Sequence, residues 1–216
     1  MLYALNELNE KIAPTPASKA ICPICGKEVI SKCGQINAWH WSHINIQDCD
    51  PWNESENEWH YNWKSRFSSN NCEINIRNHR ADILTSNNEV IELQSTYISP
   101  DEIIERERHY INMLWLFNVI DSEINIDFRN MKPGKNYASF RWKYPKKHIA
   151  YTTKPTILDL GNKLFILKKM FKSTPCGGWG YFISVNAFLN IKNFNNNSYF
   201  KKEIDPKNYW QTKNDY

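Results

Sequence analysis

At 216 residues, with 41% apolar and 14% aromatic side chains, the chain is large and apolar enough for one sizeable globular core and a small appended module. No stretch approaches the roughly 18 apolar residues that a membrane span needs. Residues 1–10 also lack a basic segment followed by an apolar core. These features exclude a membrane span and a secretory signal, so we expect a cytoplasmic protein without a membrane partner.

The net charge of +4 hides an uneven distribution along the chain. Residues 1–131 hold 11 Lys and Arg against 19 Asp and Glu, whereas residues 132–216 hold 16 against 4. An acidic part that can hold cations, joined to a basic part that can hold phosphates, suits a protein that acts on nucleic acid. A charge bias is more often a solvated surface, so it only supports the motifs below.

The first motif is a knuckle, C-P-I-C-G, in which Cys22 and Cys25 have the spacing of half a zinc site. The other half must come from two of four nearby side chains: Cys33, His40, His43 and Cys49. We choose His43 and Cys49, with His40 as the substitute, which gives a closed and therefore structural Cys3His site. A segment of this size has little core of its own, so the ion would decide whether it folds.

Residues 53–67 predict a helix, because Trp59, Trp63 and Phe67 recur at helical spacing and form one buried stripe. The neighbouring stripe would carry three polar side chains one turn apart: Glu56, His60 and Lys64. The alternative is an ordinary surface ladder of charges.

The segment 80–94, R-A-D-I-L-T-S-N-N-E-V-I-E-L-Q, predicts two short strands joined by a turn at residues 86–88. Asp82 on one strand and Glu92 and Gln94 on the other would meet in the middle of this apolar hairpin. Two carboxylates and an amide make a candidate Mg²⁺ site, since hard divalent cations prefer oxygen ligands. The alternative is that these side chains simply face solvent.

The flanking elements complete an order of helix, three strands, helix and strand. Residues 73–77 form the first strand, followed by a tight turn at residues 78–79. Ser99-Pro100-Asp101-Glu102 predicts a helix start, with Ser as the N-cap, Pro in the first turn and Glu completing the cap. This helix carries Arg106 and Tyr110 on one face and precedes the apolar strand M-L-W-L-F-N-V-I.

Beyond Asp121 the chain predicts further strands, with a hairpin at residues 161–162 and an Asn-rich tail. Six residues mix charge with aromatic rings, as suits contact with a nucleic-acid backbone and base stacking: Arg141, Trp142, Lys143, Tyr144, Lys146 and Lys147. The alternative is an exposed hairpin edge protected by lysines.

This order, with an acid on each of the second and third strands, resembles the PD-(D/E)XK nuclease superfamily. More closely, residues 20 to about 120 resemble the competence protein CoiA-like family in a collinear series of motifs. The motifs are C-P-I-C-G, W-H-W-S-H, C-D-P-W, E-W-H-Y-N-W-K, R-A-D-I, I-E-L-Q-S, I-S-P-D-E, R-E-R-H-Y and M-L-W-L.

The resemblance implies an α/β (α+β) fold with a restriction-endonuclease-like αβββαβ core and a mixed sheet. It implies a zinc-ribbon-like module at residues 1–52 and a nuclease-like domain with a basic C-terminal extension at residues 53–195. An Asn- and Lys-rich tail follows at residues 196–216. It further implies that His43 is the zinc ligand and that Glu56 belongs to the active face.

One departure concerns the third strand, where the usual E-x-K of the superfamily is E-x-Q, with Gln94 in place of the lysine. A lysine places a positive charge near the attacking water, whereas an amide only hydrogen-bonds it. We hypothesise that Lys64 supplies the missing charge.

The expected function is therefore a nuclease that hydrolyses DNA phosphodiester bonds with catalytic Mg²⁺ or Mn²⁺ and structural Zn²⁺. Asp82 and Glu92 would hold the catalytic ion, Gln94 would orient the water, and Glu56 and His60 would complete the shell. Two further residues would support the site or contact a phosphate: Arg106 and Tyr110.

The expected substrate is single- or double-stranded DNA, in DNA uptake, recombination or phage defence. A protein partner or a homo-oligomer stays open. The rival function is a non-catalytic zinc-containing DNA-binding protein or a subunit of a larger nucleic-acid complex.

Overall fold

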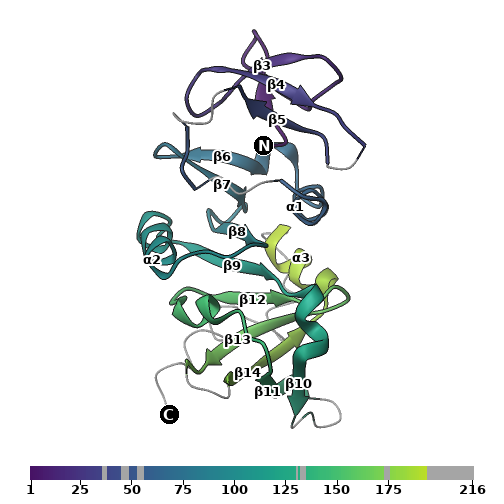
Figure 1. The fold of residues 1–216 in the computed structure, drawn as a ribbon, viewed down its shortest axis with the longest axis vertical. Coiled ribbons are helices and arrows are strands. Elements are labelled where there is room, and N and C mark those ends of the chain that lie inside the picture. Colours follow the sequence, from purple (N-terminus) through teal and green to yellow (C-terminus); the bar gives the residue numbers. More distant parts are fainter. Residues whose placement is uncertain are drawn as a thin grey trace. The chain divides into compact units, whose positions relative to one another are not determined.

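The computed structural model describes residues 1–35, 38–44, 49–52, 56–129, 131, 135–172 and 176–193. The chain divides into two compact units, Met1–Thr96 and Tyr97–Tyr216, whose elements are labelled in Figure 1. The first unit contains the predicted zinc module together with the helix and three strands that follow it. The predicted boundary at residues 52 and 53 therefore stays a prediction, and the predicted tail lies outside the described residues. No helix in the described ranges is long and apolar enough to cross a membrane.

The first unit begins with a five-stranded antiparallel sheet in the order β2-β1-β3-β4-β5. Its strands are β1 Ala4–Leu5, β2 Lys11–Ile12, β3 Lys19–Ile21, β4 Glu28–Lys32 and β5 His40–His43. The small core of this sheet consists of Met1, Ala4, Ala20, Cys22, Val29 and Trp41. So few apolar side chains give limited stability without further cross-links.

Helix α1 spans Glu58–Lys64, and the predicted helix continued to residue 67. The predicted start at residues 53–55 lies outside the described residues. Helix α1 begins after the N-cap Asn57, whose side-chain oxygen accepts a hydrogen bond from the amide of His60 at 3.1 Å. Trp63 is buried as predicted, whereas Trp59 is half-buried. A 3₁₀ turn, η2 Ser69–Asn71, leads to the next strand.

Three antiparallel strands follow: β6 Cys72–Ile76, β7 His79–Leu84 and β8 Val90–Gln94. The turn between β6 and β7 is Arg77–Asn78, with φ of 50° and 70°, one residue earlier than predicted. Positive φ at both central residues is what a tight two-residue hairpin turn requires. The register therefore places Glu73 opposite Asp82, because Cys72 pairs with Ile83 and Ile74 with Ala81.

The second unit contains helix α2 and a mixed sheet in which β10, β11, β14, β13, β12 and β9 are successive neighbours. Only the β12–β9 pair among these strands is parallel. Helix α2 spans Pro100–His109 and has the predicted N-cap Ser99. The strands are β9 Met113–Asn118, β10 Ile126–Arg129, β11 Tyr137–Trp142, β12 Thr156–Asp159, β13 Leu164–Met170 and β14 Cys176–Ile183.

Shorter elements complete the unit: η3 Ile120–Asn125, η4 Lys147–Tyr151 and α3 Val185–Asn193. Four phenylalanines on one side of the sheet contact one another through their rings: Phe128, Phe140, Phe165 and Phe182. The predicted hairpin between β12 and β13 is present, with Gly161 at a φ of 91°.

The chain is thus a mixed α+β protein in which sheet predominates. Elements α1, β6, β7, β8, α2 and β9 follow one another in the predicted order. Their assignment to a restriction-endonuclease-like core remains a proposal.

Candidate metal and carboxylate sites

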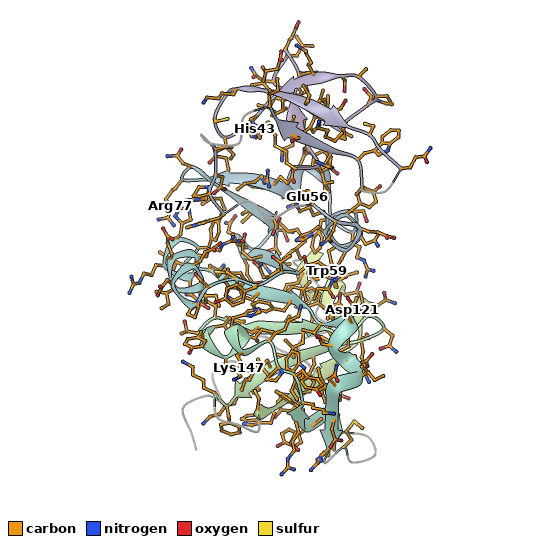
Figure 2. All side chains as sticks on the ribbon, viewed as in Figure 1. His43, Glu56, Trp59, Arg77, Asp121 and Lys147 are labelled. Atoms are coloured by element: carbon orange, nitrogen blue, oxygen red, sulfur yellow. The ribbon has the colours of Figure 1, made fainter. Side chains whose placement is uncertain are left out.

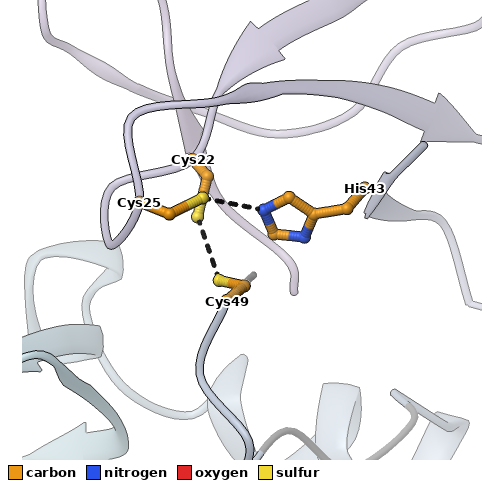
Figure 3. Close-up of side chains that lie close together, drawn as sticks. All are labelled: Cys22, Cys25, His43 and Cys49. Atoms are coloured by element: carbon orange, nitrogen blue, oxygen red, sulfur yellow. Dashed lines mark hydrogen bonds between the residues drawn. The ribbon is translucent and has the colours of Figure 1, made fainter. Parts of the chain in front are cut away.

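The four predicted zinc ligands lie together in the first unit. The ligand atoms of Cys22, Cys25, His43 and Cys49 all lie within 4.8 Å of one another. Figure 3 shows the Cys22 and Cys49 Sγ atoms at 3.8 Å and the Cys25 Sγ atom 3.2 Å from His43 Nε2. Two thiolates that are each ~2.3 Å from a tetrahedral zinc ion are about 3.8 Å apart. The donor set and its spacing therefore fit zinc.

Local sequence explains why the knuckle has this shape. The amide of Gly26 donates to the carbonyl of Cys22 at 3.0 Å, and Gly26 has a φ of 69°, which favours glycine. The amide of Ile24 points at the Cys22 sulfur at 3.4 Å, which helps to stabilise negative charge on it. All six cysteines are free thiols, so the three cysteines of the cluster are available as metal ligands.

The alternative ligand His40 is not in the cluster. Its Nδ1 atom lies 2.8 Å from the carbonyl oxygen of Ala38. Cys33 also lies outside the cluster. The structure thus brings together the chosen set of four and not the substitute.

The segment after Cys49 ties the zinc cluster to strand β7. The Asp50 carboxylate accepts one hydrogen bond from the Arg80 amide at 2.7 Å. Its other oxygen lies 2.9 Å from the Nδ1 atom of His79. The Trp52 ring stacks on that of His79, with centroids 3.4 Å apart. Because β7 also carries Asp82, the cysteine cluster and the hairpin share one continuous set of contacts.

A second cluster surrounds Lys64 at the end of α1. The Lys64 Nζ atom lies 2.6 Å from Glu56 Oε1, 3.1 Å from Glu73 Oε1 and 3.0 Å from Asp82 Oδ1. Lys64, Glu56 and Glu73 are almost completely buried, whereas Asp82 keeps 16% of its side-chain exposure. Glu56, labelled in Figure 2, lies just before α1 and still reaches the lysine two helical turns later. We call Glu56, Lys64, Glu73, Asp82 and Glu92 the carboxylate–lysine cluster.

The charges in this cluster stabilise one another. Burial by itself would lower the pKa of Lys64, but the Asp82, Glu56 and Glu73 carboxylates raise the pKa well above its usual range. Burial would raise the pKa of Glu73, but Lys64 and Arg80 hold it well below its usual range. The same competition lowers the pKa of Asp82, through Lys64 and then His60. Lys64 is therefore a cation at neutral pH, and Glu73 and Asp82 are anions.

Glu73 is a site residue that the sequence analysis missed. Its two carboxylate oxygens accept the backbone amides of Leu2 and Tyr3, each at 2.8 Å. The residue has a φ of 53°, an uncommon conformation for a glutamate. One signal could have revealed it: a turn at residues 77–78 places position 73 directly opposite Asp82.

Glu92 and Gln94 lie on β8 and are both buried. The register of β7 and β8 pairs Ile83 with Ile91, so one further residue along the strands brings Asp82 beside Glu92. The amide of Asp82 donates to Glu92 Oε1 at 3.4 Å, and the amide of Leu93 donates to Asp82 Oδ2 at 3.0 Å. Each carboxylate thus contacts the backbone of the neighbouring strand, and the joint role of the two acids in holding a metal stays a prediction.

The remaining predicted residues have defined surroundings but untested roles. His60 is buried, and its Nδ1 atom lies 2.9 Å from Asn57 Oδ1. Arg106 and Tyr110 belong to the second unit, where the Nε atom of Arg106 donates to Glu102 Oε1 at 3.0 Å and Tyr110 is buried at the end of α2.

The basic segment needs a correction. Trp142 retains only 2% exposure and packs inside the second unit, so it cannot stack on a base. Tyr144, two residues further along the chain, is 66% exposed. The Lys143 Nζ atom lies 5.1 Å from the centroid of its ring. Trp142 is the last residue of β11 and shares the buried side of that strand with Ala138 and Phe140, whereas Tyr144 lies beyond the end of the strand.

Comparison with known proteins gives one match, which covers the zinc-cluster region. No curated protein and no solved structure matches the chain. Residues 8–51, which include all four clustered cysteine and histidine ligands, match the family described as Competence protein CoiA, N-terminal domain.

Proposed function

We propose that this chain is a CoiA-like, metal-dependent nuclease that hydrolyses phosphodiester bonds in DNA. The observation that carries the proposal is the contact between the Asp82 amide and Glu92 Oε1 at 3.4 Å on adjacent strands, with the Lys64 Nζ atom 3.0 Å from Asp82 Oδ1. The element order around the pair and the match at residues 8–51 support a restriction-endonuclease-like core.

The residues of the cluster suit a hard divalent cation. Asp82 and Glu92 offer carboxylate oxygens, and Asp82 is the member that keeps contact with solvent. Two buried oxygens of the site, Glu56 Oε2 and Gln94 Oε1, have no hydrogen-bond partner among the residues that the structure describes. Such oxygens need a partner, and a hydrated Mg²⁺ or Mn²⁺ ion supplies one.

Each side chain then has a part in hydrolysis. A bound divalent ion lowers the pKa of a coordinated water and neutralises charge on the phosphate. Lys64, a permanent cation at neutral pH, stabilises the negative charge that develops on the phosphoryl oxygens. Gln94 orients the attacking water, and Glu73 positions Lys64.

The test is cleavage of supercoiled plasmid and of circular single-stranded DNA with Mg²⁺ or Mn²⁺ supplied or omitted. Asp82→Asn and Glu92→Gln should each lower the cleavage rate about 100-fold or more, comparable to the loss of one transition-state contact. The matched control is Glu58→Gln, because Glu58 is an exposed acid on helix α1 of the same unit. This variant should keep the full rate.

If the zinc-loaded protein binds DNA but cleaves neither substrate with either ion, the nuclease proposal is wrong. That outcome supports the rival function, a non-catalytic zinc-containing DNA-binding protein.

A further inference from the structure

The second unit carries a group of aromatic and basic side chains that the proposed chemistry does not use. Strand pairing places Tyr137 opposite Tyr181 and Ser139 opposite Trp179, and opposite residues of antiparallel strands point to the same face. Lys169 of β13 pairs with Trp179 and so lies on the same face. The Phe171 amide donates to the carbonyl of Gly177, and Gly177 lies opposite Arg141, so Phe171 and Arg141 also share this face. One side of the β11–β14–β13 sheet therefore presents what we call the aromatic–basic face: Tyr137, Phe171, Trp179, Tyr181, Arg141 and Lys169.

On β11 this face is the reverse of the buried side, whereas on β13 it continues into Ile166, which pairs with Tyr181 and is buried. The side chains that alternate with it on β11, Ala138, Phe140 and Trp142, are buried. In contrast, Tyr137 is 36% exposed and Phe171 is 45% exposed, while Trp179 and Tyr181 are half-buried. Large aromatic side chains that remain at the surface of a sheet with a complete core on its other side point to a ligand.

The rings are held in position by one another. The Tyr137 ring lies 5.9 Å from that of Trp179 and 5.7 Å from that of Tyr181, and the latter two are 6.3 Å apart. A ring that is already fixed by its neighbours loses little conformational freedom when a ligand packs on it. The group is thus suited to binding flat molecules.

The charges of the face identify the ligand as an anion. Arg141 and Lys169 are exposed, and the Lys169 Nζ atom lies 5.3 Å from the Phe171 ring centroid. Asp127, opposite Arg141 on β10, is already paired with Arg129. Residues 132–216 as a whole hold 16 basic against 4 acidic residues. A nucleic-acid strand combines flat bases with anionic phosphates along a repeating chain. The faces of its bases are accessible only when the strand is single-stranded.

We propose that the aromatic–basic face binds single-stranded nucleic acid, by stacking bases on Phe171, Tyr137 and Trp179 and by pairing phosphates with Arg141 and Lys169. The proposal rests on the proposed function in one respect, namely that the ligand is the nucleic acid on which the chain acts. It adds a strand preference and a location for binding.

The experiment measures fluorescence anisotropy of a labelled oligo(dT) strand and of a labelled duplex of equal length. The buffer contains neither Mg²⁺ nor a chelator, so that nothing is cleaved and zinc is retained. The single strand should bind about tenfold more tightly than the duplex, and Phe171→Ala or Tyr137→Ala should each weaken single-strand binding about fivefold or more. Lys169→Ala should lower the slope of log K against log salt by about 0.7.

Tyr97→Ala is the matched control. Tyr97 is a 71% exposed aromatic of the same unit, but it contacts His148, which in turn contacts Phe117 on the other side of the sheet. Its removal should leave binding unchanged. Binding is measured without Mg²⁺ and cleavage with it, so loss of cleavage and loss of binding are separate results.

Three outcomes would overturn the proposal. The first is that the duplex binds as tightly as the single strand or more tightly. The second is that the aromatic substitutions weaken binding no more than Tyr97→Ala does. The third is that a polyanion such as heparin displaces the strand while the aromatic variants bind as the wild type does. The last outcome would describe a general basic surface or a site for an acidic protein.

Discussion

The zinc cluster and the carboxylate–lysine cluster both gather polar side chains inside the first unit, but they balance charge in opposite ways. The zinc cluster consists of three cysteines and His43, so it includes no lysine or arginine side chain. The carboxylate–lysine cluster holds Lys64 within 3.1 Å of three acids, with Arg80 close enough to help lower the pKa of Glu73. The first cluster therefore offers four donors that fit an external ion, whereas in the second a buried lysine already offsets part of the negative charge.

This difference predicts different metal affinities. Zinc at four soft donors contributes directly to folding, with apparent values of ~10 to 16 kcal/mol in zinc-finger peptides. A magnesium ion at Asp82 and Glu92 must share its carboxylates with Lys64, so it should bind weakly and exchange freely. Zinc should therefore remain through purification and Mg²⁺ should have to be supplied.

The largest effect is expected from loss of zinc. Cys25→Ser should release the ion and unfold strands β1–β5, because their core is small. Native mass spectrometry gives the zinc content, and hydrogen exchange gives the protection of each strand. The matched control is Cys33→Ser, a cysteine outside the cluster, which should keep one zinc ion. A Cys25→Ser protein with full zinc content and full protection would contradict the structural role.

A smaller effect is expected at the buried lysine. Lys64→Met keeps the volume but leaves buried carboxylates without their cation, so it should lower the free energy of unfolding by about 3–5 kcal/mol. Urea denaturation followed by far-UV circular dichroism measures this loss. Millimolar Mg²⁺ should restore part of it, because the ion replaces the missing charge.

The control for Lys64 is Lys19→Met. Lys19 pairs with Glu28 at 2.8 Å, but both side chains are largely exposed. An exposed pair contributes at most about 1 kcal/mol. Equal losses for the two variants would mean that the buried cluster does not depend on its lysine.

The smallest effect is expected from pH. The pKa of Glu73 is lower in the folded protein, so its contribution is fully present above the unfolded value of about 4 and is lost as the pH falls through the folded value. The pKa of Lys64 is higher in the folded protein, so its contribution is present below about 10 and is lost only in stronger alkali. These two groups should thus add no pH dependence to the free energy of unfolding between about pH 5 and 9.

Glu73→Gln tests this assignment, because the amide cannot titrate. Its denaturation midpoint should be lower than that of the wild type at pH 7 and should fall less steeply below pH 4. A wild-type acid slope in this variant would assign the effect to other carboxylates.

Local chemistry made much of the structure predictable from the sequence. The knuckle at Cys22 and Cys25, the Ser99 cap of α2 and the turn at Gly161 depend on neighbours within a few residues, and each is present. The pairing of Asp82 with Glu92 also follows from a short hairpin, since one turn fixes which residues are opposite.

The tertiary structure alone decided the features that join distant parts of the chain. The Glu73 carboxylate accepts the amides of Leu2 and Tyr3, about seventy positions away, and no local pattern encodes this contact. The burial of Trp142 and the exposure of Phe171 depended on which side of the sheet each residue faces. Sequence fixes local conformation because its interactions are short-range, but burial and charge pairing depend on which segments the fold brings into contact.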